Sequence, residues 1–457
     1  TEAVGAGLQQ RITRLTDLAA ADLRGANADV ERRGAGGGRG GAFIRTAGGA
    51  GGGRSGAFAG VAGGAGRGRA RAALSAAPRA RPPAILSPMP SPPDPRMLAP
   101  FGTPPAGLGG RIRSIAEDFR VVELPAYPRD GQPGHLYLEM TKRGLDTEAA
   151  LVQVARALGV PRAEVGLAGL KDRHAITTQW ISVPAAAGPR LERFRHEAIT
   201  LGPAQAHSHK LRRGHLRGNR FVIVVRELAL PFADAHALAR ARLDELARAG
   251  LRNAFGEQRF GHGGRNLDAG LAALRGRAPR GHKADLLVSA GQSGLFNLYL
   301  ALRHERGLLD RVLLGDLLHK RSGGMFECSE VEVDQARLDA GELVPTGPIY
   351  GSKLRWPSLD TPAHALELDV LERAGVPLRK LEQLGRAVPG TRRDLRVWPE
   401  HASVDAEPAA ALPELGLSEG ITLRFDLPAG SYATVLLAEL GVPSSLTHAR
   451  DEMSRGT

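Results

Sequence analysis

The sequence predicts an α+β fold whose sheet is mixed or antiparallel. Segments in which apolar and polar residues partly alternate, as in half-buried strands, are interspersed with segments that have apolar residues at helical spacing. The chain has 457 residues, of which 42% are hydrophobic. This length allows two or three domains, and the apolar content is sufficient for their cores.

The first hundred residues differ in composition from the rest. They carry 14 Arg and Lys against 6 Asp and Glu, so +8 of the formal net charge of +13 lies here. Residues 34–74 are rich in Gly, Ala and Arg without regular periodicity, and a proline-rich connector runs from Arg81 to Pro105. We expect residues 1–105 to be a disordered extension. It is either dispensable, which we favour, or an arm whose arginines contact phosphates without reading sequence.

The folded part is expected to begin near Leu108, with strands and helices in succession. Partial alternation predicts strands at 111–124 and 135–143, and the apolar and β-branched runs that follow predict strands at 176–184, 219–228 and 421–430. Helical spacing predicts helices at 147–158, 233–250, 286–307, 367–384 and 431–441. The first of these helices is expected to stop at Gly159, because Pro161 lies just beyond.

The pattern changes after Gly261, where long helical stretches and a less regular middle section follow. We therefore expect a discontinuous core, residues 108–261 and 393–448, that is interrupted by an insertion of residues 262–392.

What the sequence lacks excludes several classes of protein. The single cysteine, Cys328, excludes an internal disulfide framework and a zinc site with two thiolates, and it suits a reducing cytoplasm. His207, His209 and His215 do not form a compact zinc pattern with it. Gly261–Asn266 lacks P-loop spacing, and no apolar run approaches the roughly 20 residues that cross a bilayer. We expect a cytoplasmic protein without a metal site, a nucleotide cofactor or a membrane segment.

One carboxylate is surrounded by cations. In the segment Ala168–Trp180, Asp172 lies between Lys171 and Arg173 on a turn that we place at a sheet edge. Neighbouring positive charge keeps such a carboxylate ionised, and an ionised carboxylate in a basic cleft can act as a nucleophile toward a polyanionic substrate. Taken alone, this pattern is more typical of a solvated turn or a structural ion pair.

Six sequence blocks in a fixed order are more specific than any single motif. They read EDFRVVEL, GLKDRHAITTQWISV, GHLRGNRFVIVVR, NAFGEQRFG, SAGQSGLFNLYLALR and FDLPAGSYATVLLAELG. With these blocks the chain resembles the tRNA pseudouridine synthase D family (TruD) from about Gly109 to Pro443. The resemblance implies a pseudouridine synthase-type core with a family-specific α+β insertion, and an enzyme that isomerises uridine to pseudouridine in tRNA.

The resemblance also implies roles for individual residues. Asp172 corresponds to the essential aspartate of the pseudouridine synthases, and the sequence leaves open whether it attacks covalently or removes the ribose 2′ proton. Phe221 corresponds to the ring that stacks on the flipped uracil, and Asn219 to a residue that orders the catalytic loop. Without the resemblance, Phe221 is more typical of a core residue and Asn219 of a turn.

Four further residues correspond to positions beside the cleft. Lys171 is expected to meet phosphate, and Glu117 either to orient a basic neighbour or to be a surface acid. Arg259 is expected to hold phosphate and Gln258 to bind base or backbone edges, although each is as typical of a structural hydrogen-bonding residue. The isomerisation needs no redox change and no group donor, so no cofactor is implied.

The expected substrate, by resemblance, is uridine 13 in the D arm of a tRNA, glutamate tRNA in bacterial members, and we expect a monomer. The alternative is a non-catalytic RNA-binding protein or tRNA chaperone that uses the same basic cleft. The joint presence of Asp172, Asn219 and Phe221 argues against this alternative, because a protein that only binds RNA does not need them as a set.

Overall fold

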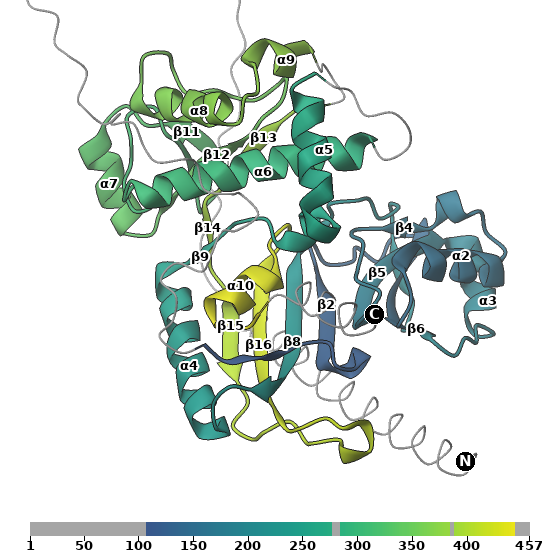
Figure 1. Cartoon of the computed structure of the whole chain (residues 1–457). Coiled ribbons are helices and arrows are strands. Elements are labelled where there is room, and N and C mark those ends of the chain that lie inside the picture. The colour runs from purple at the N-terminus through teal and green to yellow at the C-terminus, as the bar shows by residue number, and fades with distance from the viewer. Residues whose placement is uncertain (1–106, 277–283, 384–387, 444–457) are drawn as a thin grey trace, which may run out of the picture. The chain divides into compact units, whose positions relative to one another are not determined.

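The computed structural model describes residues 107–276, 284–383 and 388–443. The predicted extension of residues 1–105 and the last residues of the predicted core, 444–448, lie outside the described residues. Within them, one ten-stranded sheet, one four-stranded sheet and a short two-stranded pairing account for the strands (Figure 1).

The larger sheet has the strand order β15-β16-β8-β2-β5-β3-β6, and the short strands β1, β4 and β7 pair with β8, β5 and β3. Strands β2 and β5 run parallel, and the other described pairs are antiparallel. The predicted α+β fold with a mixed sheet is therefore confirmed. The strands are β1 (Gly109–Arg111), β2 (Phe119–Pro125), β3 (His135–Arg143), β4 (Gly166–Leu167), β5 (Ile176–Pro184), β6 (Ile199–Leu201), β7 (Gln205–His207), β8 (Leu216–Leu228), β15 (Glu400–Val404) and β16 (Gly420–Pro428).

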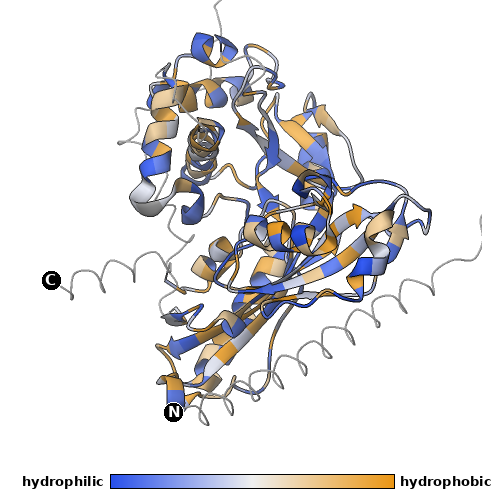
Figure 2. Ribbon diagram, turned by 90° about the vertical axis from the view of Figure 1, so that its right-hand side faces the viewer, coloured by the Kyte–Doolittle hydropathy of each residue, from blue (hydrophilic) through white to orange (hydrophobic). Residues whose placement is uncertain are grey.

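Alternation along β8 produces the main core. Phe221, Ile223 and Val225 are buried on one side of this strand, and their neighbours in sequence are mostly less buried. Hydrophobic and hydrophilic residues alternate along the strands of the sheet (Figure 2). The helices α4 (Phe232–Ala249) and α10 (Ala433–Glu439) contribute Ala239, Leu436 and other apolar residues to the same core.

Helix α2 (Thr147–Leu158) lies where the sequence predicts it, and its ends explain why. The Asp146 side chain accepts hydrogen bonds from the Glu148 and Ala149 backbone amides, and Gly159 ends the helix in the left-handed conformation. Its apolar face, including Leu151 and Val154, packs with residues of β3 and β5. A short helix, α3 (Gly188–Leu191), follows β5.

A second sheet has the antiparallel order β11-β10-β12-β13. Its strands are β10 (Leu317–Lys320), β11 (Met325–Glu327), β12 (Leu343–Ile349) and β13 (Thr391–Asp394). Helix α6 lies across this sheet (Figure 1). The helices of this part are α5 (Arg265–Leu274), α6 (Ala284–Glu305), α7 (Val331–Asp339), α8 (Pro362–Arg373) and α9 (Leu378–Gln383). The two-stranded pairing joins β9 (Leu251–Arg252) to β14 (Arg396–Val397). The division into a core of 108–261 and 393–448 and an insertion of 262–392 stays a prediction.

Two predicted elements are interrupted in the structure. The strand expected at 111–124 is broken between β1 and β2 by a short 3-10 helix, Ala116–Asp118, because the buried Asp118 turns inward to pair with Arg226 at 2.8 Å. The helix expected at 367–384 is two helices, since the chain turns at Gly375, whose φ is +61°, before Pro377. Residue 384 itself lies outside the described residues.

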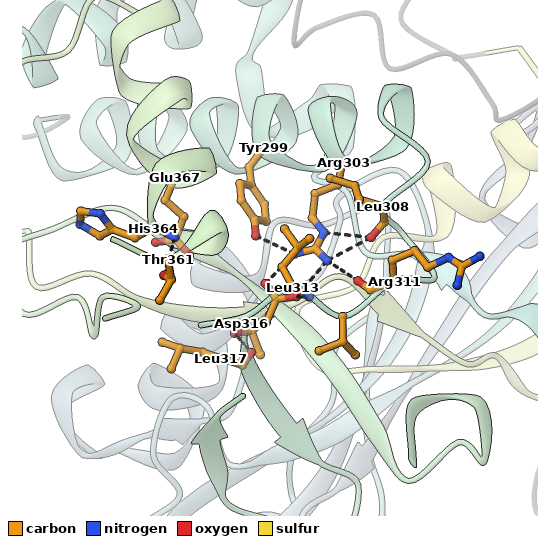
Figure 3. Close-up of polar contacts among 12 residues, drawn as sticks. Tyr299, Arg303, Leu308, Arg311, Leu313, Asp316, Leu317, Thr361, His364 and Glu367 are labelled. Carbon is orange, nitrogen blue, oxygen red and sulfur yellow. Dashed lines mark hydrogen bonds and ion pairs between the residues drawn. The ribbon is translucent and has the colours of Figure 1, made fainter. Parts of the chain in front are cut away.

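A buried ion pair holds the second sheet to α6 (Figure 3). Arg303 on α6 is fully buried, and its guanidinium donates to both carboxylate oxygens of Asp316 at 2.7 and 3.0 Å. It also donates to the Tyr299 hydroxyl and to the carbonyl oxygens of Leu308 and Arg311. The guanidinium is satisfied on all three nitrogens, so Asp316, which directly precedes β10, is fixed beneath the helix.

We expect Asp316→Ala to lower the free energy of unfolding by about 3–5 kcal/mol, because it leaves the Arg303 charge buried and unpaired. The matched control is Asp310→Ala, which removes an acid that pairs with Arg396 at 2.7 Å but is mostly exposed. It should cost at most about 1 kcal/mol. Denaturant unfolding monitored by circular dichroism measures both changes, and equal losses would contradict the importance of the buried pair.

Candidate active site

The segment Gly169–His174, hereafter the 169–174 loop, connects β4 to β5. Strand β5 lies between β2 and β3 in the larger sheet. The prediction of a sheet edge for Asp172 was therefore wrong, because β3 and α2 form a crossover that brings β5 parallel to β2 inside the sheet. The loop thus lies at one end of the interior strands rather than along an edge strand.

The loop borders a pocket of about 300 Å³. Besides the loop, four sequence-distant parts of the chain supply the walls: the start of β2 with the segment before it, the first half of β8, the segment around Gln258 and the segment around Tyr432. The lining residues are Arg113, Phe119, Val121, Leu170, Lys171, Asp172, Asn219, Phe221, Gln258, Arg259, Ser431, Tyr432, Ala433 and Thr434. Six of the seven site residues predicted from sequence come together here, and Glu117 is absent from the lining.

Asp172 presents a half-exposed carboxylate to this pocket. Its Oδ2 accepts a hydrogen bond from Arg113 Nη2 at 2.6 Å, whereas Oδ1 has no hydrogen-bond partner among the described residues. The Asp172 side chain is 52% exposed. The Arg113 guanidinium also lies over the Phe119 ring, 4.1 Å from its centroid, and the Arg113 backbone has a φ of +61°. Arg113, a strained non-glycine residue, therefore orients one carboxylate oxygen and leaves the other open.

Buried polar side chains hold the backbone of the loop from below. Lys142 on β3 is fully buried and donates from Nζ to the carbonyl oxygen of Asp172 at 2.7 Å and to that of Leu145 at 2.7 Å. Thr147 Oγ1 accepts from the Lys171 amide at 2.9 Å, and Gln179 Nε2 donates to the Gly169 carbonyl at 3.0 Å. We call Lys142, Thr147 and Gln179 the loop clamp. Burial lowers the pKa of Lys142 to about 8, partly opposed by Asp172 and Asp146.

The Lys171 side chain points into the protein. Its Nζ pairs with Glu123 Oε2 at 2.8 Å and donates to Asn219 Oδ1 at 2.6 Å, and only 6% of the side chain is exposed. Glu123 also accepts from the Trp180 amide, and burial raises its pKa against the opposing effect of Lys171. These contacts differ from the phosphate contact expected of Lys171, because a buried carboxylate already holds the ammonium. They link Asn219 on β8 to the 169–174 loop.

Phe221 has the contacts of a core residue. Its ring is stacked on Phe425 with centroids 5.4 Å apart, and it meets Phe119 edge-on at 6.4 Å. Only 7% of the residue is exposed, and it belongs to the main core while also lining the pocket. The fold thus accounts for Phe221 by itself, and its stacking on a base stays a prediction.

Gln258 and Arg259 lie in a 3-10 turn, Glu257–Phe260, where the sequence predicted a loop. Gln258 Oε1 accepts from Thr434 Oγ1 at 3.2 Å, and Arg259 donates to the hydroxyls of Ser289 and Ser293 on α6. Both residues line the pocket. The partners of Arg259 are neutral, so its charge is not cancelled by them.

Glu117 lies in the 3-10 helix Ala116–Asp118 before β2, and it does not line the pocket. Its Oε1 accepts from Arg143 Nε at 2.7 Å, and its carbonyl accepts from Arg120. Glu117 therefore contacts a basic neighbour, Arg143, which is one of the two roles expected of it. Whether Arg143 contributes to substrate binding stays a prediction.

A larger pocket of about 740 Å³ adjoins the first, and Arg259 lines both. Its cationic side chains are Arg259, Lys353, Arg355, Arg392 and Arg393. Asp394 is the acid in the lining, and it pairs with His319 at 3.1 Å. Positive charge therefore predominates in this pocket.

Internal contacts fix two of these arginines. Arg392 Nη1 pairs with the buried Glu367 at 2.8 Å, and burial raises the pKa of Glu367 to about 7 although Arg392 opposes this. Arg393 donates to Asn253 and lies over the Phe255 ring, and burial lowers its pKa to about 10. The wall of the larger pocket is thus pre-organised.

The described residues contain no group of three or more His, Cys, Asp or Glu side chains placed to hold a metal ion. His207 is instead buried beside Tyr127 and pairs with Asp130, and Cys328 lies in a separate apolar cluster. No helix in the described ranges is long and apolar enough to cross a membrane.

Comparison with known proteins decides the family. The family model "tRNA pseudouridine synthase D (TruD)" matches residues 99–278 and 277–440 of the chain. The chain belongs to the tRNA pseudouridine synthase D family. It is accordingly an isomerase of the pseudouridine synthase class, and the family predicted from the six sequence blocks is confirmed.

The relatives align with this chain over nearly all of their own length. A tRNA pseudouridine synthase D of Anaeromyxobacter sp. (strain Fw109-5) is 42% identical over 343 residues, 73% of this chain and 93% of the relative. One of Thermus thermophilus is 39% identical over 349 residues, 76% and 92% of the two chains. A crystal structure described as a putative tRNA pseudouridine synthase D from Methanosarcina mazei has a TM-score of 0.61 at 25% identity, and covers 75% of this chain and 95% of that one. It confirms the predicted pseudouridine synthase-type fold.

Arg113, Lys142 and Tyr432 line or support this pocket but were not predicted from the sequence. One signal for Lys142 was present: in the predicted strand at 135–143 it shares a face with Leu138 and Met140, so alternation turns its charge inward. For Arg113 there was no such signal, because its position depends on a positive φ between two strands. Tyr432 lies in a block used for the resemblance but was not singled out.

The lowered pKa of Lys142 predicts a pH dependence of stability. Between about pH 8 and 10.5 the unfolded chain holds a proton on Lys142 that the folded chain has lost, so this group makes the free energy of unfolding rise with pH. Lys142→Met should remove this slope, which is at most about 1.4 kcal/mol per pH unit. Denaturant unfolding of both proteins at several pH values measures the difference.

Lys320→Met serves as the control for this comparison, because Lys320 is an exposed lysine of the second sheet. It should leave the slope unchanged. A wild-type slope equal to that of Lys142→Met would show that Lys142 titrates normally in the folded protein.

Proposed function

We propose that this protein converts uridine 13 of a tRNA, glutamate tRNA in particular, into pseudouridine, with Asp172 as the catalytic carboxylate and the target uridine flipped into the smaller pocket. The observation that carries the proposal is the open Oδ1 of Asp172, which has no hydrogen-bond partner among the described residues, in a pocket lined by aromatic rings and by the amide side chains of Asn219 and Gln258. The relatives are named tRNA pseudouridine synthase D, which supports tRNA as the substrate.

The pocket offers what a base outside its helical stack requires. Phe119, Phe221 and Tyr432 supply aromatic surface in exchange for the lost stacking partners. Asn219 and Gln258 supply amide groups that match the polar edge of uracil. The rings of Phe119 and Phe221 are fixed by the core, so the base meets a rigid floor.

Asp172 acts on the ribose while Arg113 holds its second carboxylate oxygen. The ion pair with Arg113 favours the ionised carboxylate, as required both for attack on an electrophilic carbon and for removal of the ribose 2′ proton. In the covalent route, Oδ1 bonds ribose C1′ as the bond from C1′ to uracil N1 breaks, and the electron pair of that bond leaves with the uracilate. When C5 then joins C1′, Oδ1 leaves as the carboxylate. In the other route Oδ1 accepts the 2′ proton as the uracilate departs, which leaves a C1′–C2′ double bond, and the proton returns to C2′ when C5 joins C1′. In both routes C5 finally loses its proton and N1 gains one, so the product is an isomer of uridine.

The larger pocket binds the RNA backbone. Arg259 lines both pockets, so a strand whose base enters the smaller pocket has its phosphates beside Lys353 and Arg355, the exposed cationic side chains of the larger pocket. A non-catalytic RNA-binding protein needs this pocket but has no use for an oriented, half-exposed carboxylate beside it. We also propose that the protein acts as a cytoplasmic monomer, and that it needs no metal or cofactor.

Asp172→Asn is expected to lower pseudouridine formation more than a hundredfold and to leave tRNA affinity and thermal stability near the wild-type values. The amide keeps the shape of the side chain but cannot serve as nucleophile or base. Mass spectrometry of glutamate tRNA after incubation measures the product and its position. Asp244→Asn, on the exposed face of α4, is the matched control. A variant that retained more than about a hundredth of the rate would refute the assignment.

Lys353→Ala should weaken tRNA binding and reduce the slope of log affinity against log salt by about 0.7 to 0.9, the value for one lost phosphate contact. No described side chain partners its ammonium, so the substitution breaks no ion pair. Binding at several salt concentrations gives the slope, and the modified position should not change. An unchanged slope would place the RNA backbone elsewhere.

A further inference from the structure

An exposed apolar side chain lies at the rim of the smaller pocket. Leu170 is 58% exposed and directly precedes Lys171 and Asp172. In the described part of the chain, the other large apolar side chains with comparable exposure are Val152, Leu286, Leu314, Val333, Leu359, Leu378 and Leu415. None of these seven lines the pocket that contains Asp172, whereas Leu170 does.

The backbone on either side of Leu170 is fixed. The carbonyl of Gly169 accepts from Gln179, and the amide of Lys171 donates to Thr147. The side chain of Lys171 is anchored by Glu123 in the interior. Leu170 therefore cannot turn inward to hide its side chain without breaking buried hydrogen bonds, so its exposure is imposed by the loop clamp.

Cations occupy the same rim. Arg113 and Arg259 line the pocket together with Leu170, and Arg259 continues into the basic pocket. When an RNA strand places a base beside Asp172, the stacked bases next to that base therefore lie against Leu170. When one base leaves a stack, its neighbours lose apolar contact, and an inserted apolar side chain restores it.

We propose that Leu170 is a wedge that enters the base stack of the RNA at the place vacated by the flipped uridine, and so stabilises the flipped state. This inference rests on the proposed function. Leu170 is thus a positioning residue: it acts on the neighbours of the target base, while Asp172 acts on the target nucleotide. Its contribution depends on apolar volume and not on charge or hydrogen bonding.

The test compares wild type, Leu170→Ala and Leu170→Met on a glutamate tRNA transcript that carries 2-aminopurine next to the target uridine. Binding of wild type should raise the 2-aminopurine fluorescence, since the probe loses its stacked neighbour. Leu170→Ala should show a smaller rise and a single-turnover rate about tenfold lower, with affinity within about threefold of wild type because phosphate contacts dominate binding. Leu170→Met, which keeps the apolar volume, should recover most of both signals.

Leu359→Ala is the matched control, because Leu359 is 76% exposed and lines none of the pockets described above. It should behave as wild type, and the melting temperatures of all variants should agree, since both leucines are exposed. The wedge would be overturned if Leu170→Ala kept the wild-type rate and the wild-type rise in fluorescence. It would also be overturned if Leu170→Met lost as much rate and fluorescence rise as Leu170→Ala. A wild-type protein that forms no pseudouridine in this tRNA would instead overturn the proposed function on which the wedge rests.

Discussion

The hydrogen bonds between the loop clamp and the backbone of the 169–174 loop are the constraint on which the site depends. Lys142, Thr147 and Gln179 each bind a backbone group of this loop, and all three side chains are buried. A buried ammonium is costly, as the lowered pKa of Lys142 shows, and its place in the fold is explained by the two carbonyl groups that it satisfies. The result is a loop whose backbone is fixed from within and whose side chains Leu170 and Asp172 face outward.

The rest of the site is built from the centre of the fold. Strands β2, β5 and β8 are neighbours in the sheet, and with the segments that precede β2 and β5 they bring together Arg113, Asp172 and Asn219, which are far apart in sequence. Phe119 and Phe221 belong to the main core and to the pocket at the same time. Substitutions at these rings therefore change both the stability of the core and the shape of the pocket, whereas Asp172 and Leu170, which are exposed, can be changed without disturbing the core.

Much of this architecture is predictable from the sequence because local signals are strong where elements are regular. Strand β3 has the bounds that the alternation of apolar and polar residues predicts. Helix α2 ends before Gly159, and strand β5 has the bounds predicted from its strand-like sequence. The break between β1 and β2 was not predictable in this way, since it depends on the pairing of Asp118 with Arg226, more than a hundred residues away. The same holds for Lys171, which the family resemblance predicts to meet phosphate, whereas the fold pairs its ammonium with the buried Glu123. The sequence shows which residues are able to take part in chemistry, but the direction of their side chains depends on tertiary contacts.

A crystal structure of the protein with a tRNA whose target uridine is replaced by 5-fluorouridine tests the proposed role of Asp172 most directly. We predict that the modified base lies in the pocket between Phe221 and Tyr432, with Asp172 bonded to the nucleotide or within about 3.5 Å of its ribose. We also predict that the hydrogen bonds from Lys142 and Thr147 to the loop are retained. A base bound elsewhere, or a 169–174 loop that has left the loop clamp to reach the substrate, would contradict this role.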